Sequence, residues 1–252
     1  MLDPPDRTDP TVHLPQIDGA LLEIRAAEGG LDAGVWAFDL LQMYREFAER
    51  QGWQPAVWQL RNWGGATSVA VSAVAEVVIA LESEDAYLRL YWESGEHQVQ
   101  RPPVLGAGRV HTSTALVTVL PRVQETEVAI IDEDVQEDLV EQPTGDLEHP
   151  PEVSVRLRHM PSGLVITWQM KPWQVTSKAR AREVLRSRLF ELKGLQHMGS
   201  ARQAQKIRTY NFRENRVTDH RLGLSLYSLD RIVRGELDDL LDAVAKGAEP
   251  AR

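Results

Sequence analysis

The sequence contains no cysteine among its 252 residues, and it has no long hydrophobic run. The first absence excludes disulfide bonds, thiolate nucleophiles and cysteine-based zinc sites. The second excludes a membrane-spanning helix, which needs about 20 consecutive apolar residues. The first 16 residues are polar and rich in proline, without the apolar centre of a signal peptide. We therefore expect a soluble cytoplasmic protein with no membrane partner.

The signatures of common enzyme classes are also missing. The seven histidines show no metal-ligand spacing, and no Gly-Lys-Ser phosphate loop occurs. We expect no metal and no cofactor. No familiar enzyme site therefore competes with a binding function.

Basic residues are fewer than acidic ones, 28 against 37, and the net charge is −9. Their distribution is uneven. Residues 123–152 contain eleven acidic side chains and no Lys or Arg, whereas residues 156–221 contain fifteen basic and four acidic ones. A field of one sign costs self-repulsion, which a polyanion relieves. The basic segment predicts a nucleic-acid partner, with a merely solvated basic face as the alternative.

The apolar periodicity and the turn residues predict an α+β fold. We expect strands at 20–26, 53–60, 128–131, 153–157 and 164–169, and a strand or helix at 68–81. We expect helices at 32–51, 177–192 and 229–245. Residues 191–204 are expected to be a linker, and residues 206–218 a basic, turn-rich segment.

One stretch organises the rest of the chain: residues 91–121, YWESGEHQVQRPPVLGAGRVHTSTALVTVLP. It reads as a strand, a basic loop and a second strand whose alternation is that of a half-buried element. Side chains able to hydrogen-bond a base edge or a phosphate gather around the loop: Gln100, Arg101, Arg109, His111 and Thr112. The pattern fits an RNA-contacting loop displayed by a sheet, or a polar hairpin on a domain surface.

Three separated blocks resemble the bacterial class I peptide chain release factors. The first, LLEIRAAEGGLDA, is similar to the family's LEIRAGTGGDEA. The second, ESGEHQVQR with GRVHTST, is similar to ESGVHRVQR with GRIHTST. The third, KIRTYNFRENRVTDHR, is similar to KIRTYNFPQNRVTDHR and precedes a matching helix. A weaker fourth block is VRLRHMPSGLVITWQ with SKARAREVLRSRL. Together they cover roughly residues 17–245 in the family's order.

The resemblance implies a division into segments. Residues 17–122 and 196–252 would form a decoding superdomain for the ribosomal A site, and residues 153–195 a degenerate β-α domain of the family's catalytic type. Residues 1–16 would be a flexible leader, and residues 123–152 an acidic linker. The family's N-terminal helical domain is expected to be absent. The implied partners are the ribosome, through 16S and 23S rRNA and the mRNA codon in the A site, and other translation factors; we expect a monomer.

The resemblance also assigns decoding residues. The Gly29–Gly30 turn with Asp32 matches the tip that contacts the first codon base. Gln100 and Thr112 match the third-base readers, and His111 matches a stacking histidine. The second-position tripeptide aligns with Pro103, Val104 and Leu105, where leucine has no hydroxyl to bond a base. Contacts with ribosomal RNA are expected from Arg101, Arg109, Lys178, Arg180, Arg182, Lys206, Arg208, Arg213, Arg216, His220 and Arg221.

One family motif is missing. The Gly-Gly-Gln loop positions a backbone N–H and a glutamine beside the peptidyl-tRNA ester. At the matching place this chain reads EQPTGDLEHPPEVS, in which Gln142 follows no glycine pair. We therefore expect no catalytic residue and no peptidyl-tRNA hydrolysis, so that the chain would not be an enzyme.

Three functions remain open at this point. The favoured one is an A-site binder in translation termination, ribosome rescue or quality control that does not hydrolyse. The second is a genuine releasing factor that uses a non-standard or partner-supplied catalytic group. The third is an RNA-binding protein that acts away from the ribosome.

Overall fold

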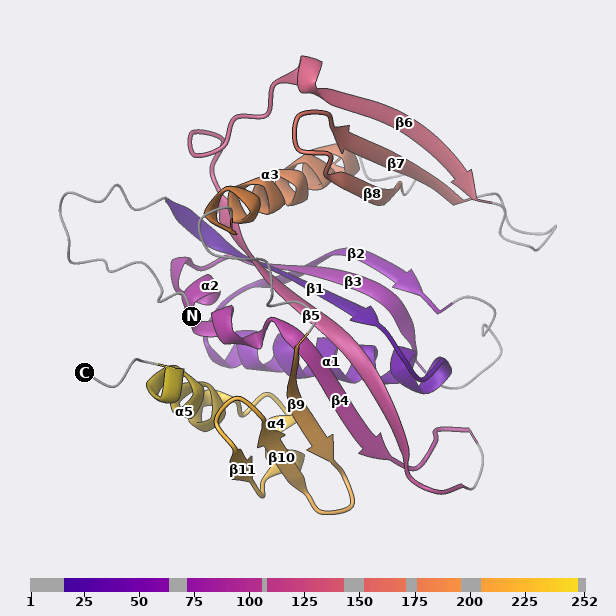
Figure 1. Ribbon diagram of the computed structural model, residues 1–252, viewed down its shortest axis with the longest axis vertical. Coiled ribbons are helices and arrows are strands. Elements are labelled where there is room, and N and C mark those ends of the chain that lie inside the picture. The colour runs from indigo at the N-terminus through magenta and orange to yellow at the C-terminus, as the bar shows by residue number, and fades with distance from the viewer. Residues whose placement is uncertain are drawn as a thin grey trace. The chain divides into compact units, whose positions relative to one another are not determined.

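The computed structural model describes residues 16–63, 72–105, 108–142, 152–170, 176–195 and 205–248. They fall into two compact units. The first holds the described residues within 19–119 and within 205–248, and the second those within 120–195 together with residues 16–18. Each unit contains a sheet and helices (Figure 1), which confirms the expected α+β class.

An eight-stranded sheet forms the body of the first unit. In spatial order its strands are β11 (Leu224–Leu226), β10 (Arg216–Asp219), β9 (Lys206–Asn211), β4 (Gly95–Arg101), β5 (His111–Val123), β1 (Ile17–Ala26), β3 (Val74–Leu81) and β2 (Pro55–Asn62). Neighbours β4 and β9 run parallel, whereas the β1–β3, β2–β3, β4–β5, β9–β10 and β10–β11 pairs are antiparallel. Strand β3 reads VAEVVIAL, and its last five residues are buried, so this apolar strand contributes to the core.

Helix α1 (Leu31–Arg50) packs on one face of this sheet (Figure 1). It begins directly after the Gly29–Gly30 turn, in which both glycines have positive φ, and Gln51 caps its end. The apolar stripe predicted for it is confirmed, since five side chains are fully buried: Trp36, Leu40, Met43, Tyr44 and Phe47. Burying each large apolar side chain stabilises the fold by roughly 1.5–3 kcal/mol.

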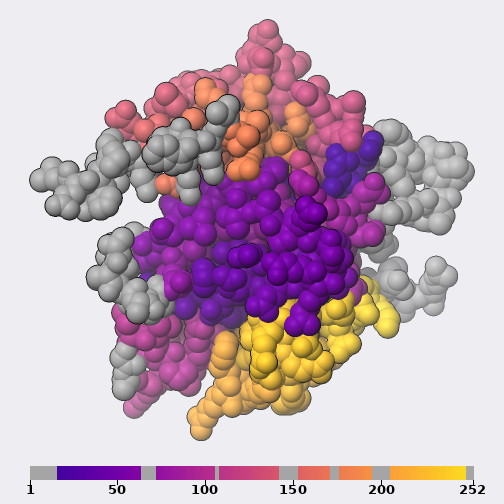
Figure 2. Space-filling view, turned by 180° about the vertical axis from the view of Figure 1, so that it is seen from behind, coloured from indigo at the N-terminus to yellow at the C-terminus, as the bar shows by residue number. Residues whose placement is uncertain are grey.

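The C-terminal part of the chain completes the same unit. Strand β9 lies beside β4, and the helices α4 (Leu229–Ile232) and α5 (Asp238–Ala248) contribute buried leucines to the core. Figure 2 shows these C-terminal residues, in yellow, against the residues of α1, in indigo to purple. Two short elements, α2 (Glu84–Leu90) and the 3-10 turn η1 (Tyr91–Glu93), lead into β4.

The prediction of a single helix at 229–245 is wrong for the middle of that range. Residues 233–237 separate α4 from α5. Gly235 has φ 79°, and a Cβ placed on it would come within 2.5 Å of the backbone nitrogen of Phe47. The chain turns here because only glycine tolerates this conformation this close to α1.

The second unit has its own sheet, in the order β6 (Val135–Gln142), β7 (Glu152–His159) and β8 (Val165–Met170). Helix α3 (Ser177–Leu195) belongs to the same unit, with Ala181, Val184, Leu185 and Leu189 buried. The sheet contributes further buried side chains: Val155, Leu157, Ile166 and Trp168. The two strands and the helix expected at 153–192 are thus present.

The acidic block differs from its expected local structure. The short strand expected at 128–131 does not form; instead residues 135–142 form β6, and a 3-10 turn, η2 (Asp132–Asp134), precedes it. One of its acidic residues, Asp138, lies opposite the basic Arg156 in the β6–β7 register. The Lys178 ammonium also contacts the Glu137 carboxylate.

Some expectations lie outside the described residues: the leader at 1–15, the start of the 68–81 element, and the segments at 143–151 and 196–204. Of 68–81, residues 74–81 form a strand, and of the expected 191–204 linker, residues 191–195 continue α3. The five-segment division therefore stays a prediction. Among the described residues, no helix is both long and apolar enough to span a membrane.

Candidate functional site

The β4–β5 hairpin places the predicted decoding residues opposite one another. In its register, Gln100 lies across from Thr112, and Arg101 lies across from His111. The connection between the strands, described except for residues 106 and 107, extends beyond the sheet, and Leu105 is 55% exposed. His111 and Thr112 are also exposed. The hairpin therefore presents Leu105, His111 and Thr112 to solvent from the end of two paired strands, as a recognition loop requires.

The Gly29–Gly30 turn reaches the same hairpin. Thr114 and Glu28 exchange backbone and side-chain hydrogen bonds: the Thr114 N–H donates to the Glu28 carbonyl at 2.8 Å, and the Glu28 N–H donates to Thr114 Oγ1 at 2.9 Å. Gly29 has φ 121°, and a Cβ on it would lie 2.4 Å from Ser113 Oγ. The close approach to Ser113 explains why glycine occupies this position. The turn holds the start of α1 against β5.

Asp32, in the first turn of α1, joins the turn to the loop. Its Oδ1 accepts a hydrogen bond from the Val104 N–H at 2.8 Å. Its Oδ2 lies 3.7 Å from His111 Nδ1. Residues from three separate parts of the sequence, the turn, the loop and the start of β5, thus meet at one place.

Arg101 is held inside the protein rather than displayed. Its guanidinium contacts the Asp39 carboxylate at 2.5 Å, and its side chain is 15% exposed. The guanidinium carbon lies 6.0 Å from the ring centre of Trp36 and 5.6 Å from that of Phe212, within range of cation–π attraction. Burial raises the pKa of Asp39, although the Arg101 charge opposes this. These internal contacts engage the Arg101 side chain, and the RNA contact expected from it stays a prediction.

Gln100 is fixed from the C-terminal part of the chain. Asn211 Nδ2 donates to Gln100 Oε1 at 3.2 Å, and the Phe212 N–H donates to the Gln100 carbonyl at 3.1 Å. These bonds set the orientation of the Gln100 amide. No local sequence pattern indicates this pairing, because it depends on the parallel neighbours β4 and β9.

A fully buried polar network lies beneath the hairpin. The Arg208 guanidinium donates to both oxygens of Glu93, at 2.5 and 2.6 Å, and to Asp219 at 3.2 Å. Arg208, Glu93 and Asp219 are each buried, with none of the Arg208 side chain exposed. Burial raises the pKa of Glu93, but the Arg208 charge outweighs burial, so the pKa of Glu93 lies below its usual value.

This network corrects one expected RNA contact. Arg208 cannot reach an RNA, because its charge is neutralised by two buried carboxylates on η1 and β10. It instead ties the C-terminal strands to the hairpin. A buried ion pair of this kind contributes little net stability against an apolar replacement, but removing one partner costs roughly 3–5 kcal/mol.

His97 completes the network. Its Nε2 donates to the Glu93 carbonyl at 3.0 Å, so its Nδ1 accepts a hydrogen bond from the Tyr210 hydroxyl, also at 3.0 Å. The Trp36 indole N–H donates to the His97 carbonyl at 3.0 Å. Burial lowers the pKa of His97 to about 4, and the imidazole is therefore neutral at neutral pH. Burial also raises the pKa of Tyr210 to about 12.

The other predicted RNA contacts vary in exposure. Arg109, Lys206, Arg213 and His220 are exposed. Arg216 pairs with Glu214 at 2.9 Å, and Arg221 is bound to Asp219 and to the Trp92 carbonyl. In the second unit Lys178 contacts Glu137, Arg182 contacts Asp132, and Arg180 is half-buried on α3. For all of these, the RNA contact stays a prediction.

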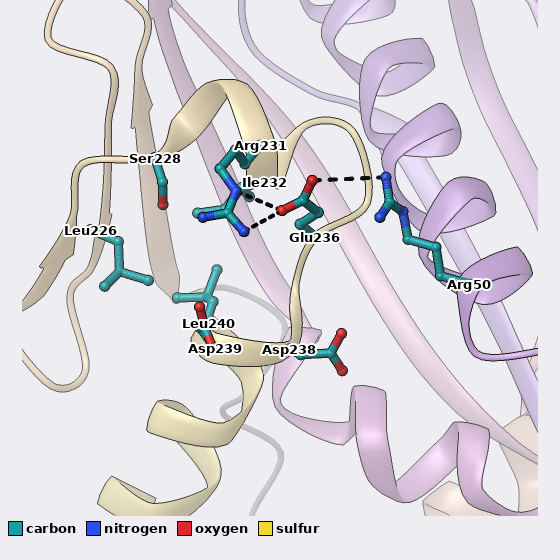
Figure 3. A pocket seen from close by; sticks show the side chains of 9 residues that line it. All are labelled: Arg50, Leu226, Ser228, Arg231, Ile232, Glu236, Asp238, Asp239 and Leu240. Atoms are coloured by element: carbon teal, nitrogen blue, oxygen red, sulfur yellow. Dashed lines mark hydrogen bonds and ion pairs between the residues drawn. The ribbon is translucent and has the colours of Figure 1, made fainter.

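A separate hollow of about 370 Å³ lies at the end of α1 (Figure 3). It is lined by Arg50, Leu226, Ser228, Arg231, Ile232, Glu236, Asp238, Asp239 and Leu240. Glu236 contacts Arg231 at 2.6 Å and Arg50 at 3.9 Å, and Asp238 accepts from Arg89 at 2.8 Å. The charged side chains around this hollow largely neutralise one another. The hollow does not include the β4–β5 hairpin. Within the described part of the chain, no cluster of acidic or histidine side chains could hold a metal ion.

Two family models match the chain: a PCRF domain at residues 11–117 and an RF-1 domain at residues 151–221. The chain is 39% identical over 249 residues to peptide chain release factor 1 of Paracoccus denitrificans, covering 92% of this chain and 68% of that protein. The chain belongs to the class I release factor family. It is also 40% identical over 238 residues to peptide chain release factor 1 of Lacticaseibacillus casei, covering 89% of this chain and 65% of that protein.

The solved structure of RF2 of Thermus thermophilus has the same release-factor fold. It matches with a TM-score of 0.77 at 33% identity, over 94% of this chain and 70% of that one. The chain spans about 65% of the length of several curated relatives. The resemblance seen in the sequence is thereby confirmed.

Membership of the release factor family corrects one expectation. We expected that the chain is not an enzyme, because its sequence has no Gly-Gly-Gln. The matched relatives are peptide chain release factors, which are hydrolases of peptidyl-tRNA, and the RF-1 model covers residues 151–221. No described residue gives a positive sign of lost catalysis, and residues 143–151 lie outside the described part. The expected loss of hydrolysis is therefore wrong.

Proposed function

We propose that the chain binds the ribosomal A site as a release-factor-type protein in translation termination or ribosome rescue. One observation carries the proposal: the Gly29–Gly30 turn, the loop and the start of β5 converge, so that His111 and Thr112 are exposed beside Asp32. These are the residues that the family resemblance assigns to codon contact. The 16S and 23S rRNA and the A-site codon are the proposed binding partners.

The geometry supports recognition of a single-stranded nucleic acid. His111 offers a ring for stacking on a base, and the Gln100 amide and Thr112 hydroxyl offer hydrogen bonds to base edges. Because Asn211 fixes the orientation of Gln100, that amide is preorganised. The exposed basic side chains Arg109 and Arg213 supply phosphate contacts, which give affinity without sequence preference.

The loop also exposes apolar side chains. Leu105 and Val110 are 55% and 47% exposed. Apolar side chains cannot accept or donate a hydrogen bond to a base edge, and a lost contact of this type costs on the order of 1–3 kcal/mol of discrimination. We propose that the chain reads the second codon position less strictly than the other two.

The test is equilibrium binding of the fluorescently labelled chain to purified ribosomes with a defined A-site codon. His111→Ala and Thr112→Ala should each weaken binding about tenfold, on the scale of one lost stacking or hydrogen-bonding contact. Glu49→Ala is the matched control, because Glu49 is exposed at the far end of α1. Peptide release is measured on the same complexes.

Failure of the wild-type chain to bind any programmed ribosome refutes the proposal. Equal binding by wild type, His111→Ala and Thr112→Ala refutes the assigned site. Co-sedimentation with ribosomal RNA that is indifferent to the A-site codon would instead favour an RNA-binding function without decoding.

A further inference from the structure

Two carboxylates on α1 face the first limb of the loop, residues 101–104. Asp32 and Asp39 are seven residues apart, which is two helical turns, so they lie on the same face about 10.5 Å apart along the axis. Asp32 accepts from the Val104 N–H at 2.8 Å, and Asp39 contacts the Arg101 guanidinium at 2.5 Å.

The spacing along the loop matches that along the helix. Three extended residues, from Arg101 to Val104, span at most about 10–11 Å. The limb therefore runs alongside α1 with a bond at each end. Pro102 and Pro103 lie between the two bonds, and their fixed φ stiffens this short span.

Both interactions, Asp32 with Val104 and Asp39 with Arg101, lie in partly buried surroundings. A partner stabilises a charged group strongly in such surroundings. Nε and Nη2 of Arg101 are buried and have no hydrogen-bond partner among the described residues. The Asp39 carboxylate and the rings of Trp36 and Phe212 are thus the main groups that offset the desolvation of this cation. The Arg101 guanidinium, held in this way, serves to fix the loop inside the protein.

We propose that Asp32 and Asp39 are positioning residues that hold the loop along α1 and thereby set where Leu105 and His111 meet a nucleic acid. The helix that begins directly after the Gly29–Gly30 turn then also fixes the loop, and the two recognition elements move as one body. The second part of this inference, the effect on recognition, rests on the proposed function, whereas the anchoring itself does not.

The anchoring is tested on the free full-length chain by amide hydrogen exchange at Val104, followed by NMR. Asp32→Ala removes the acceptor and should speed exchange at Val104 roughly 10- to 100-fold, the loss of one hydrogen bond to a charged group. Asp32→Asn keeps an oxygen acceptor of the same length and should retain most of the protection. Glu49→Ala should leave Val104 unchanged.

Asp39→Ala provides a second, independent variant. It removes the partner of Arg101 and should speed exchange at Val104 as well, because the near end of the limb is released. Val104 exchange that is unchanged in both alanine variants would overturn the anchoring. Loss of protection in Asp32→Asn equal to that in Asp32→Ala would overturn the assigned hydrogen bond.

The effect on recognition is measured with the ribosome-binding assay above. Asp32→Ala should raise Kd roughly tenfold or more and alter the ratio of Kd values between codons, since displaced recognition groups lose oriented contacts. A variant that loses affinity equally for all codons would contradict a role in positioning. If the wild-type chain binds no ribosome, the proposed function fails, but Val104 exchange still decides whether the loop is anchored.

Discussion

Neutral His97 makes the stability of the fold sensitive to mild acid. Its folded-state pKa is about 4, lowered by burial from 6.5. Between these two values the unfolded chain binds a proton at this residue and the folded chain does not. The contribution of His97 to the free energy of unfolding is therefore fully present above pH 6.5, and it falls as the pH drops toward 4.

The expected magnitude follows from the two pKa values. At pH 5 the unfolded imidazole is almost fully protonated, while the folded one is about nine-tenths neutral. Linkage then lowers the free energy of unfolding by about 2 kcal/mol at pH 5 relative to pH 7.5. The buried carboxylates add little in this window, because the lowered pKa values of Glu93 and Asp219 place their loss of stability below pH 4.5.

Urea unfolding followed by tryptophan fluorescence, at pH 7.5 and at pH 5, measures this difference. His97→Gln removes the titrating group and should abolish most of the pH difference, whatever its own stability. His220→Asn is the control, because His220 is exposed and its pKa is lowered mainly by slight burial. In the wild type, NMR titration of the His97 ring gives the pKa directly. A value near 6.5 would refute the assignment of a buried, neutral imidazole.

Four other variants test the structure. Gly29→Ala should destabilise the chain by roughly 1–3 kcal/mol and weaken ribosome binding, since its Cβ would meet Ser113 at a positive φ; Gly30→Ala, with nothing within 4 Å, should cost no more than about 1–2 kcal/mol. Arg208→Met should cost roughly 3–5 kcal/mol in urea unfolding, because it leaves the buried Glu93 carboxylate without its cationic partner. Arg101→Gln should weaken loop protection as Asp39→Ala does, and wild-type protection would contradict the anchoring.

The sequence predicted the parts of the fold that local pattern controls. The apolar stripe of α1 and the two strands around the loop follow from periodicity and are present. Alternation also carried an overlooked signal: in GEHQVQR, residues 95, 97 and 99 are buried while their neighbours are partly exposed, so His97 lies on the inner face. The local sequence does not show that His97 bonds Tyr210, because the two residues are 113 positions apart.

The errors arose where a residue's role depends on distant parts of the chain. Arg208 lies in a basic segment and was assigned to RNA, yet Glu93, 115 residues away, neutralises it. The acidic block was expected to hold one short strand at 128–131, yet its strand, β6, forms at Val135–Gln142, where β7 pairs with it. In both cases a charge that looks unpaired along the sequence finds its partner only after folding.

We propose that the hairpin and the glycine turn meet the A-site codon. A cryo-EM map of the chain bound to a ribosome with an empty A site decides whether they do. We expect density for the first unit in the ribosomal A site, with His111 and Thr112 against the codon and Asp32 beside Val104. Density for the chain at another place on the ribosome, or a hairpin turned away from the codon, would contradict it.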